Sequence, residues 1–230
     1  MIMQTTKVSI NNKIDANFIK IISILYHKKC LKETRNRGIY RKVRLLRLWV
    51  FFVIMKVMKS YNTLNDYYRK LFGEKTFKVP IDAGFDCPNR DGTVAHGGCT
   101  FCTVSGSGDA IVAPDAPIRE QFYKEIDFMH RKWPDVQKYL VYFQNFTNTH
   151  EKVEVIRERY EQAINEPGVV GINIGTRPDC LPDETIEYLA ELSERMHVTV
   201  ELGLQTTYET TSDLINRAHS YELYVETVKR

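Results

Sequence analysis

Residues 77–83 read FKVPIDA, and residues 84–109 read GFDCPNRDGTVAHGGCTFCTVSGSGD. The first stretch alternates apolar and polar side chains, which predicts a half-buried β-strand. The second stretch is rich in glycine and contains three of the chain's five cysteines, Cys87, Cys99 and Cys102. A strand that runs into such a loop is typical of an α/β fold, in which active sites gather on the loops after the strands.

The rest of the chain repeats this unit of strand and helix. Apolar runs of strand length alternate with stretches of helical periodicity, which favours right-handed βαβ units and a parallel sheet. The predicted strands are 77–83, 139–143, 169–174 and 198–204, and the predicted helices are 118–133, 151–165, 182–196 and one that begins at 221. We therefore interpret residues 61–230 as four βα units of a larger barrel, with the sequence ending after the fourth strand. A self-contained four-stranded sheet is the alternative, and it would need cover for its edge strand.

The spacing of the cysteines indicates a metal centre. Eleven residues separate Cys87 from Cys99, and two separate Cys99 from Cys102. A C-x-x-C pair brings two thiolates to one metal, and iron–sulfur clusters are held by cysteine thiolates, normally four. Three thiolates would leave one iron with an open position, which a metal needs in order to act on a substrate. The loop also contains glycines that would let the backbone approach a cofactor closely, namely Gly97, Gly98, Gly106 and Gly108.

Two alternatives remain open for these thiols. Zinc also binds C-x-x-C pairs, and because its structural sites take four ligands, His96 or Cys180 would supply the fourth. The thiols could instead be unligated. An odd number of cysteines, three of them crowded together, argues against a secreted disulfide framework and favours a reducing cytosol. We interpret Cys30 as an uninvolved thiol, and Cys180 as either a buried residue or a second functional thiol.

Charge divides the chain into two regions. Residues 1–60 carry 14 Lys and Arg against two Asp and Glu, a net charge of +12, so the remaining residues contribute −9 to the overall +3. The acidic body gives no general argument for binding nucleic acid. The apolar run at 45–58 is too short for a membrane span and is interrupted by Arg47 and Lys56, so we expect no membrane span. We interpret residues 1–60 as a basic extension that the fold does not need; a basic arm that contacts RNA or membrane, or a structural helix, are the alternatives.

Four motifs in order resemble one known family. They are DAGFDCPNRDGTVAHGGCTFC with SGSGD after it, YFQNFTNT at 142–149, GTRPDCLPDE at 175–184 and VELGLQT at 200–206. They are similar to the motifs of a bacterial radical S-adenosylmethionine (SAM) family that is related to the catalytic subunit of Elongator. The likeness extends over residues 61–230. Better-known radical SAM enzymes have a three-residue first spacing, whereas this family has the long one.

The resemblance implies a fold and a chemistry. The fold is a partial (β/α)6 barrel, and the three cysteines of the loop would bind a [4Fe–4S] cluster. SAM would occupy the fourth iron through its amino and carboxylate groups. An electron from the reduced cluster would cleave SAM to methionine and a 5′-deoxyadenosyl radical, which takes a hydrogen atom from the substrate.

The resemblance also suggests which residues would contact SAM. Phe101 is similar to the aromatic residue that packs against the adenine. Gly97 and Gly98 would shape the same pocket, and the polar residues at the strand ends would form its walls, namely Gln144, Asn145, Thr176, Arg177, Glu201 and Gln205. Arg177 has a simpler alternative, which is an ion pair with Asp179. A glutamate inside a buried strand, as expected for Glu201, needs a partner, and a ligand's ammonium or hydroxyl group would serve.

Members of the family resemble tRNA-modifying enzymes. The implied reaction converts the C5 side chain of a wobble uridine from carboxymethylaminomethyl to aminomethyl in the cytoplasm. The implied partners are tRNA, an electron donor such as flavodoxin or ferredoxin, and a methyltransferase that could act afterwards. A splayed base could stack on aromatic side chains, which are plentiful in this chain. No acetyltransferase domain is indicated. The rival function is a zinc-stabilised nucleic-acid-binding module without catalysis.

Overall fold

The computed structural model describes residues 61–106 and 111–230. A parallel sheet has the order β1-β2-β3-β4, and its strands are β1 (Thr76–Ile81), β2 (Lys138–Phe143), β3 (Val169–Thr176) and β4 (His197–Leu202). Strands that are consecutive in sequence are neighbours in the sheet. Because neighbouring strands are parallel, each connection runs back along the sheet to the starting end of the next strand. The predicted α/β fold is therefore confirmed, and the arrangement agrees with four βα units of a barrel.

A row of β-branched residues shows how the strands are aligned. Val79 pairs with Val141, Val141 with Ile172, and Ile172 with Val198. Side chains alternate between the two faces of a strand, so this row lies on one face of the sheet. β-Branched side chains pack well on a pleated surface, which favours strand formation here.

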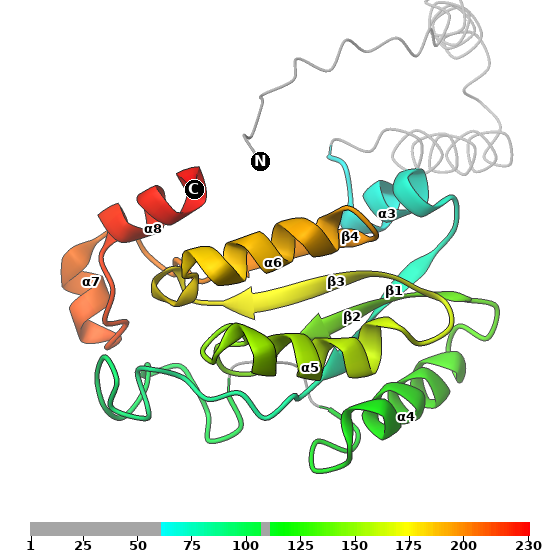
Figure 1. The fold of residues 1–230 in the computed structure, drawn as a ribbon, viewed down its shortest axis with the longest axis horizontal. Coiled ribbons are helices and arrows are strands. Elements are labelled where there is room, and N and C mark those ends of the chain that lie inside the picture. The colour runs from blue at the N-terminus through cyan, green and yellow to red at the C-terminus, as the bar shows by residue number, and fades with distance from the viewer. Residues whose placement is uncertain (1–60, 107–110) are drawn as a thin grey trace, which may run out of the picture. The chain divides into compact units, whose positions relative to one another are not determined.

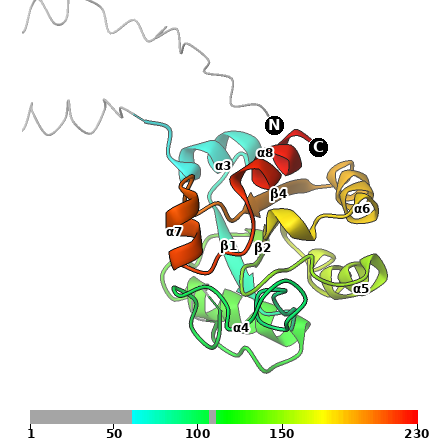
Figure 2. The same ribbon diagram turned by 90° about the vertical axis from the view of Figure 1, so that its left-hand side faces the viewer.

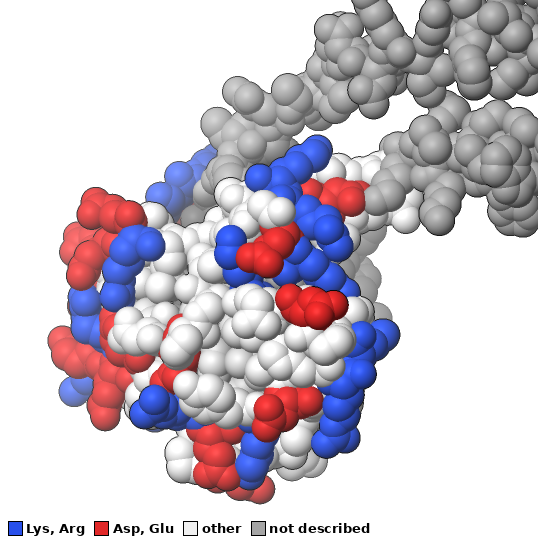
Figure 3. All heavy atoms as spheres, turned by 90° about the vertical axis from the view of Figure 1, so that its right-hand side faces the viewer, with Lys and Arg blue, Asp and Glu red and all other residues white. Residues whose placement is uncertain are grey.

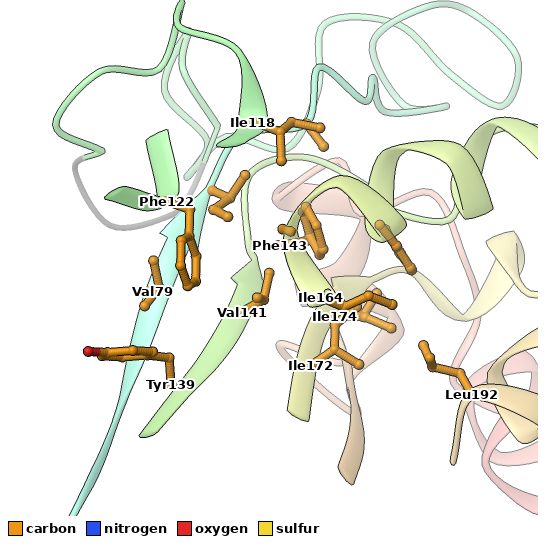
Figure 4. Packing of buried hydrophobic residues seen from close by; sticks show 14 of the residues in the cluster. Val79, Ile118, Phe122, Tyr139, Val141, Phe143, Ile164, Ile172, Ile174 and Leu192 are labelled. Atoms are coloured by element: carbon orange, nitrogen blue, oxygen red, sulfur yellow. The ribbon is translucent and has the colours of Figure 1, made fainter. Parts of the chain in front are cut away.

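Three helices cover that face of the sheet. They are α4 (Ile118–His130), α5 (Val153–Ile164) and α6 (Asp183–Ser193), and each follows one strand (Figure 1). Figure 4 shows Phe122, Ile164 and Leu192 from these helices, together with strand residues of the same apolar cluster. The ring of Phe143 stacks on that of Tyr160 with centroids 4.6 Å apart. Each large buried side chain of this core stabilises the fold by about 1.5–3 kcal/mol.

Two helices were not predicted. The first, α3 (Leu64–Phe72), has clear boundaries: the Asp66 amide donates to the Thr63 hydroxyl at its start, and Gly73 ends it with φ of 81°. The second, α7 (Glu209–Leu214), is only six residues long. The predicted C-terminal helix is present as α8 (Tyr221–Lys229), and a single 3-10 turn, η1, spans Pro178–Cys180.

Some predicted boundaries differ from the observed ones. The first strand ends at Ile81 rather than at residue 83, because the Asp82 amide donates to the Gln121 side chain instead of to a strand. Helix α4 ends at His130, ahead of Pro134, so the proline does not end it. Pro182 precedes α6 as its N-cap rather than forming its first turn.

The sheet and its helices belong to one compact unit, Thr63–Arg230. The predicted extension, residues 1–60, and Gly108 lie outside the described residues. Within the described residues, no helix has both the length and the apolar character that crossing a membrane requires. Figure 3 views the molecule from the end opposite the carboxyl ends of the strands, where basic and acidic side chains alternate around an uncharged area.

Candidate functional site

The cysteine loop, defined here as residues 82–106, leaves β1 at the edge of the sheet where all four strands end. Figures 1 and 2 show this loop and the segment of α7 and α8 on the same side of the molecule. Cys87, Cys99 and Cys102 are free thiols, and each is partly exposed. The loop therefore lies where the active sites of parallel α/β folds gather.

Tight turns shape the loop around its cysteines. The amides of Arg90 and Asp91 donate to the Cys87 carbonyl at 2.8 and 3.1 Å. The Cys102 amide donates to the Cys99 carbonyl at 3.0 Å, so the C-x-x-C pair forms a single turn. Such a turn keeps two thiols close to each other without any regular secondary structure.

The chemistry of these donors suits an iron–sulfur cluster. Within residues 61–106 and 111–230, no three Cys, His, Asp or Glu side chains already converge in a metal-holding arrangement. The thiols are nonetheless electrostatic neighbours, because Cys102 and Cys87 both act on the pKa of Cys99. Three soft thiolates from one loop are the ligands that an iron–sulfur cluster uses. The residues present therefore fit the cluster in ligand type and number.

Cys180 is one of two residues that could supply the fourth ligand of a zinc site. Cys180 is buried, and burial raises the pKa of its thiol strongly, with the neighbouring Asp179 adding to the effect. Of the two readings of Cys180, the structure agrees with a plain buried residue.

Cys99 has the closest protein partner of the three thiols. The Asn89 side-chain amide donates to the Cys99 sulfur at 3.4 Å. Burial raises the pKa of Cys99, and the hydrogen bond from Asn89 and the charge of Arg177 partly offset that rise. Bound metal would stabilise the thiolate directly.

Phe101 and Gly97 have space around them, whereas Gly98 packs against the Arg90 side chain. Phe101, between the two close cysteines, is 45% exposed. Gly97 and Gly98 have φ of 81° and 73°, which favours glycine, and a Cβ at Gly97 would meet no atom within 4 Å. The Phe101 side chain and the Cβ position of Gly97 therefore both face open space.

The second strand places its polar residues differently. Asn145 is buried and donates to the Asp82 carboxylate at 3.3 Å, so it ties the end of β2 to the end of β1. Gly106 packs against it, because a Cβ there would lie 3.5 Å from the Asn145 Cα. Gln144 is half-buried beside it. Asn145 therefore contacts both ends of the cysteine loop, at Asp82 and at Gly106.

Arg177 forms the ion pair considered as its simpler role. Its Nε and Nη2 donate to the two Asp179 carboxylate oxygens at 2.9 and 2.6 Å, and Nη1 donates to the Arg217 carbonyl at 2.8 Å. The guanidinium group is buried, yet its charge acts on both Cys87 and Cys99. Arg177 thus provides positive charge beside the thiols, which favours their thiolate forms.

Glu201 has three partners within the chain. Lys78 Nζ donates to it at 2.6 Å, the Tyr142 hydroxyl at 2.8 Å and the Asn173 amide at 3.2 Å. Burial opposes ionisation of Glu201, but the hydrogen bonds from these partners outweigh it, so its pKa lies below the ordinary value. The four residues come from four different strands and lie on the face opposite α4, α5 and α6, where Tyr68 of α3 also contacts Asn173. Glu201 therefore does not need a ligand to satisfy it, although it borders the predicted site.

Gln205 lies just beyond β4 in an exposed position. Its φ of 58° is left-handed, and its side chain lies over Gly203, where a Cβ would come within 2.6 Å of the amide nitrogen. Non-glycine residues in this region store strain, which is common near functional sites. The predicted residues thus surround one edge of the sheet, but only some of their polar groups face open space.

Three residues in this region were missed by sequence analysis. Alternation in FKVPIDA could have placed Lys78 on the face opposite Phe77 and Val79, but no local signal names its partner. Asn89 follows Cys87 and Pro88. Because Pro and Asn are common in exposed turns, the sequence gives no sign that its side-chain amide is buried. Arg217 is fully buried and donates to the carbonyls of Leu204, Thr206 and His219. Its role rests on contacts distant in sequence.

Comparison with known proteins gives a single family. The model of the Radical SAM superfamily matches residues 90–230, which starts three residues after Cys87.

The relatives come from bacteria and from an archaeon. Bacillus subtilis YtqA is 57% identical over 172 residues, which is 75% of this chain and 53% of that protein. Escherichia coli YhcC is 38% identical over 176 residues, covering 76% of this chain and 55% of that protein. Methanocaldococcus jannaschii MJ0486 is 32% identical over 166 residues, covering 71% and 50%. The chain therefore spans about half the length of the relatives that it matches.

Proposed function

Because the chain belongs to the radical SAM superfamily, we propose that it carries the cofactor site of a radical SAM enzyme. In this proposal Cys87, Cys99 and Cys102 hold a [4Fe–4S] cluster. When bound, the cluster and SAM would supply the electron and the 5′-deoxyadenosyl group that together abstract hydrogen from a substrate. The observation that carries the proposal is the placement of three free thiols on one loop at the carboxyl edge of the sheet, within a chain of this family.

The surrounding residues have roles that follow from their positions. Arg177 would favour the thiolate forms through its charge, while its donors stay engaged with Asp179 and backbone carbonyls. The exposed ring of Phe101 could stack on an adenine, and the open space beside Gly97 would admit it. Gln144, Glu201 and Gln205 would border the ligand from the other strands.

For the substrate we propose a tRNA wobble uridine, modified from carboxymethylaminomethyl to aminomethyl at C5. The resemblance of four ordered motifs to a family related to the Elongator catalytic subunit supports this choice. The proposed partners are tRNA, a flavodoxin or ferredoxin as electron donor, and a methyltransferase acting on the product. The proposed location is the cytoplasm.

The cofactor proposal is tested on protein purified without oxygen and reconstituted with iron and sulfide. We expect broad absorption at about 400 nm that dithionite bleaches, and reductive cleavage of added SAM. A colourless protein with one equivalent of zinc would instead support the rival zinc-stabilised module.

The substrate proposal needs a separate measurement. Nucleoside analysis of tRNA from cells that lack the gene should show accumulation of the carboxymethylaminomethyl form. Unchanged tRNA nucleosides in those cells, with normal SAM cleavage by the purified protein, would reject tRNA and leave the radical SAM assignment intact.

A further inference from the structure

Two asparagines connect the cysteine loop to a segment far along the chain. The Asn89 side-chain nitrogen donates to the Cys99 sulfur at 3.4 Å and to the Asn216 carbonyl at 2.5 Å. In return, the Asn216 side-chain nitrogen donates to the carbonyls of Gly98 and His96 at 2.8 and 3.0 Å. A fifth bond runs from the Thr100 amide to the Ile215 carbonyl at 3.0 Å. The turn that carries Cys99 is thereby held from outside the loop.

Asn89 is buried in a way that makes its contacts specific. Its residue is 0% exposed, and its side-chain oxygen has no hydrogen-bond partner among the described atoms. An amide with one unsatisfied buried end costs free energy, so its nitrogen contacts must offset that cost. The side-chain nitrogen of Asn89 therefore donates twice, once to the Cys99 sulfur and once to the Asn216 carbonyl.

The segment that contains Asn216 is itself fixed. Asn216 and Ala218 have φ of 53° and 60°, so the chain turns sharply at both residues. Arg217, between them, is fully buried and donates to three backbone carbonyls, which leaves the segment little freedom. Arg177, the residue after β3, donates to the carbonyls of Arg217 and Ala218. Residues 216–218, which contact the cysteine loop, are therefore themselves bonded to residues that follow β3 and β4.

A hydrogen bond to a thiolate changes the metal centre that it serves. Donors near cluster sulfurs stabilise negative charge there, so they raise the reduction potential and orient the ligand. Of the three thiols, Cys99 is the one with such a donor from a buried side chain among the described residues.

We propose that Asn89 and Asn216 are a pair of positioning residues, in which Asn216 fixes the Cys99 turn and Asn89 directs an N–H group at the Cys99 sulfur to tune the cluster. This inference rests on the proposed iron–sulfur site. It adds that the region after β4, which does not supply a ligand, controls both the order of the loop and the potential of the cluster.

Two variants separate the parts of this pair. Asn216→Gly suits the left-handed backbone and keeps the carbonyl that Asn89 uses, yet removes both bonds to the loop. Asn89→Leu keeps the branching and the number of side-chain heavy atoms, and it removes the bonds to the Cys99 sulfur and to the Asn216 carbonyl without adding charge. Asn165→Ala is the control, because Asn165 is exposed and its side-chain nitrogen donates to Glu161 of α5, away from the cysteine loop.

The first measurement uses the full chain without metal. Hydrogen–deuterium exchange of peptides that cover 96–102 should become about tenfold faster in Asn216→Gly, the factor expected for losing its two hydrogen bonds, and stay unchanged in Asn165→Ala. The second measurement follows reconstitution with iron and sulfide. The midpoint potential, from titration followed by electron paramagnetic resonance, should shift to lower values in Asn89→Leu.

Each outcome decides the inference. Unchanged exchange in Asn216→Gly together with an unchanged potential in Asn89→Leu would overturn it while the cluster assignment stands. A wild-type chain that binds no iron would instead remove the proposed function. If Asn89→Leu fails to fold, as judged by circular dichroism, Asn216→Gly decides alone through its exchange rate and its potential, because it keeps every buried side chain.

Discussion

The helix-covered face of the sheet and the cysteine loop are stabilised by different kinds of contact. On the sheet face, apolar side chains of neighbouring elements pack into one core, as in the row from Val79 to Val198. In the cysteine loop, hydrogen bonds reach segments more than a hundred residues away. The core thus supplies the stability of the fold, whereas the loop supplies the site. Substitutions in the two regions should therefore have separable effects.

The largest separation is expected for Cys102→Ala. Cluster binding and SAM cleavage should be lost completely, because two thiolates cannot hold the cluster. The free energy of unfolding of the metal-free protein should change by less than about 0.5 kcal/mol, since the thiol is partly exposed. Iron analysis and urea unfolding provide the two measurements. Retention of a full cluster would remove Cys102 from the ligand set.

The converse effect is expected in the core. Leu192→Ala removes a fully buried side chain from α6 and should lower the free energy of unfolding by about 2–5 kcal/mol. The matched control is Leu214→Ala in α7, where the leucine is 78% exposed and the change should stay within about 0.5 kcal/mol. Equal losses in both variants, measured in urea, would contradict the division between core and site.

Glu201 joins the two regions, because it lies in the sheet but borders the site. Its pKa is lower in the folded chain than the ordinary 4.5, so its contribution to stability is present above about pH 4.5 and is lost as the pH falls through the folded value. Glu201→Gln should flatten the acid side of the stability profile. The effect should be smaller than that of Leu192→Ala, since the side chain is 37% exposed. An unchanged pH profile would show that the network with Lys78 carries no net stabilisation.

The smallest effect is expected at the support of the loop. Ala218 has φ of 60°, where glycine is favoured, so Ala218→Gly should raise the free energy of unfolding by about 0.5 kcal/mol. Ala163→Gly, on the buried face of the last turn of α5, should lower it by about 1 kcal/mol. Thermal unfolding of both variants gives the sign of each change in the free energy of unfolding. A decrease for Ala218→Gly would mean that the contacts of the alanine methyl group stabilise the fold by more than the backbone strain destabilises it.

Most of the sheet could be predicted because its signals are local. Continuous apolar runs such as 169–174 and the helical periodicity of 118–133 arise from neighbours in sequence. Helix α3 also had local signals, in Thr63 and Gly73, that could have identified it. Helix α7 had none, because ETTSDL is short and contains β-branched threonines of low helix propensity.

The site could be predicted only in part. The cysteine spacing predicts a metal centre on this loop, since the chemistry depends on residue type and local separation, and the structure shows the three thiols free and partly exposed. The partners of Glu201 and of Asn89 could not be predicted, because a hydrogen bond across the fold leaves no pattern in the sequence. Arg177 shows both cases, since its ion pair with Asp179 is local whereas its bond to the Arg217 carbonyl is not.

The separation of 127 residues between Asn89 and Asn216 has a consequence during protein synthesis. At about 5–20 residues per second, a ribosome needs roughly 6–25 s to reach Asn216 after it has made Asn89. For that time the nascent thiols are in the growing chain without their support. The proposed cluster should therefore gain this support only once residue 216 has been made and has emerged from the ribosome.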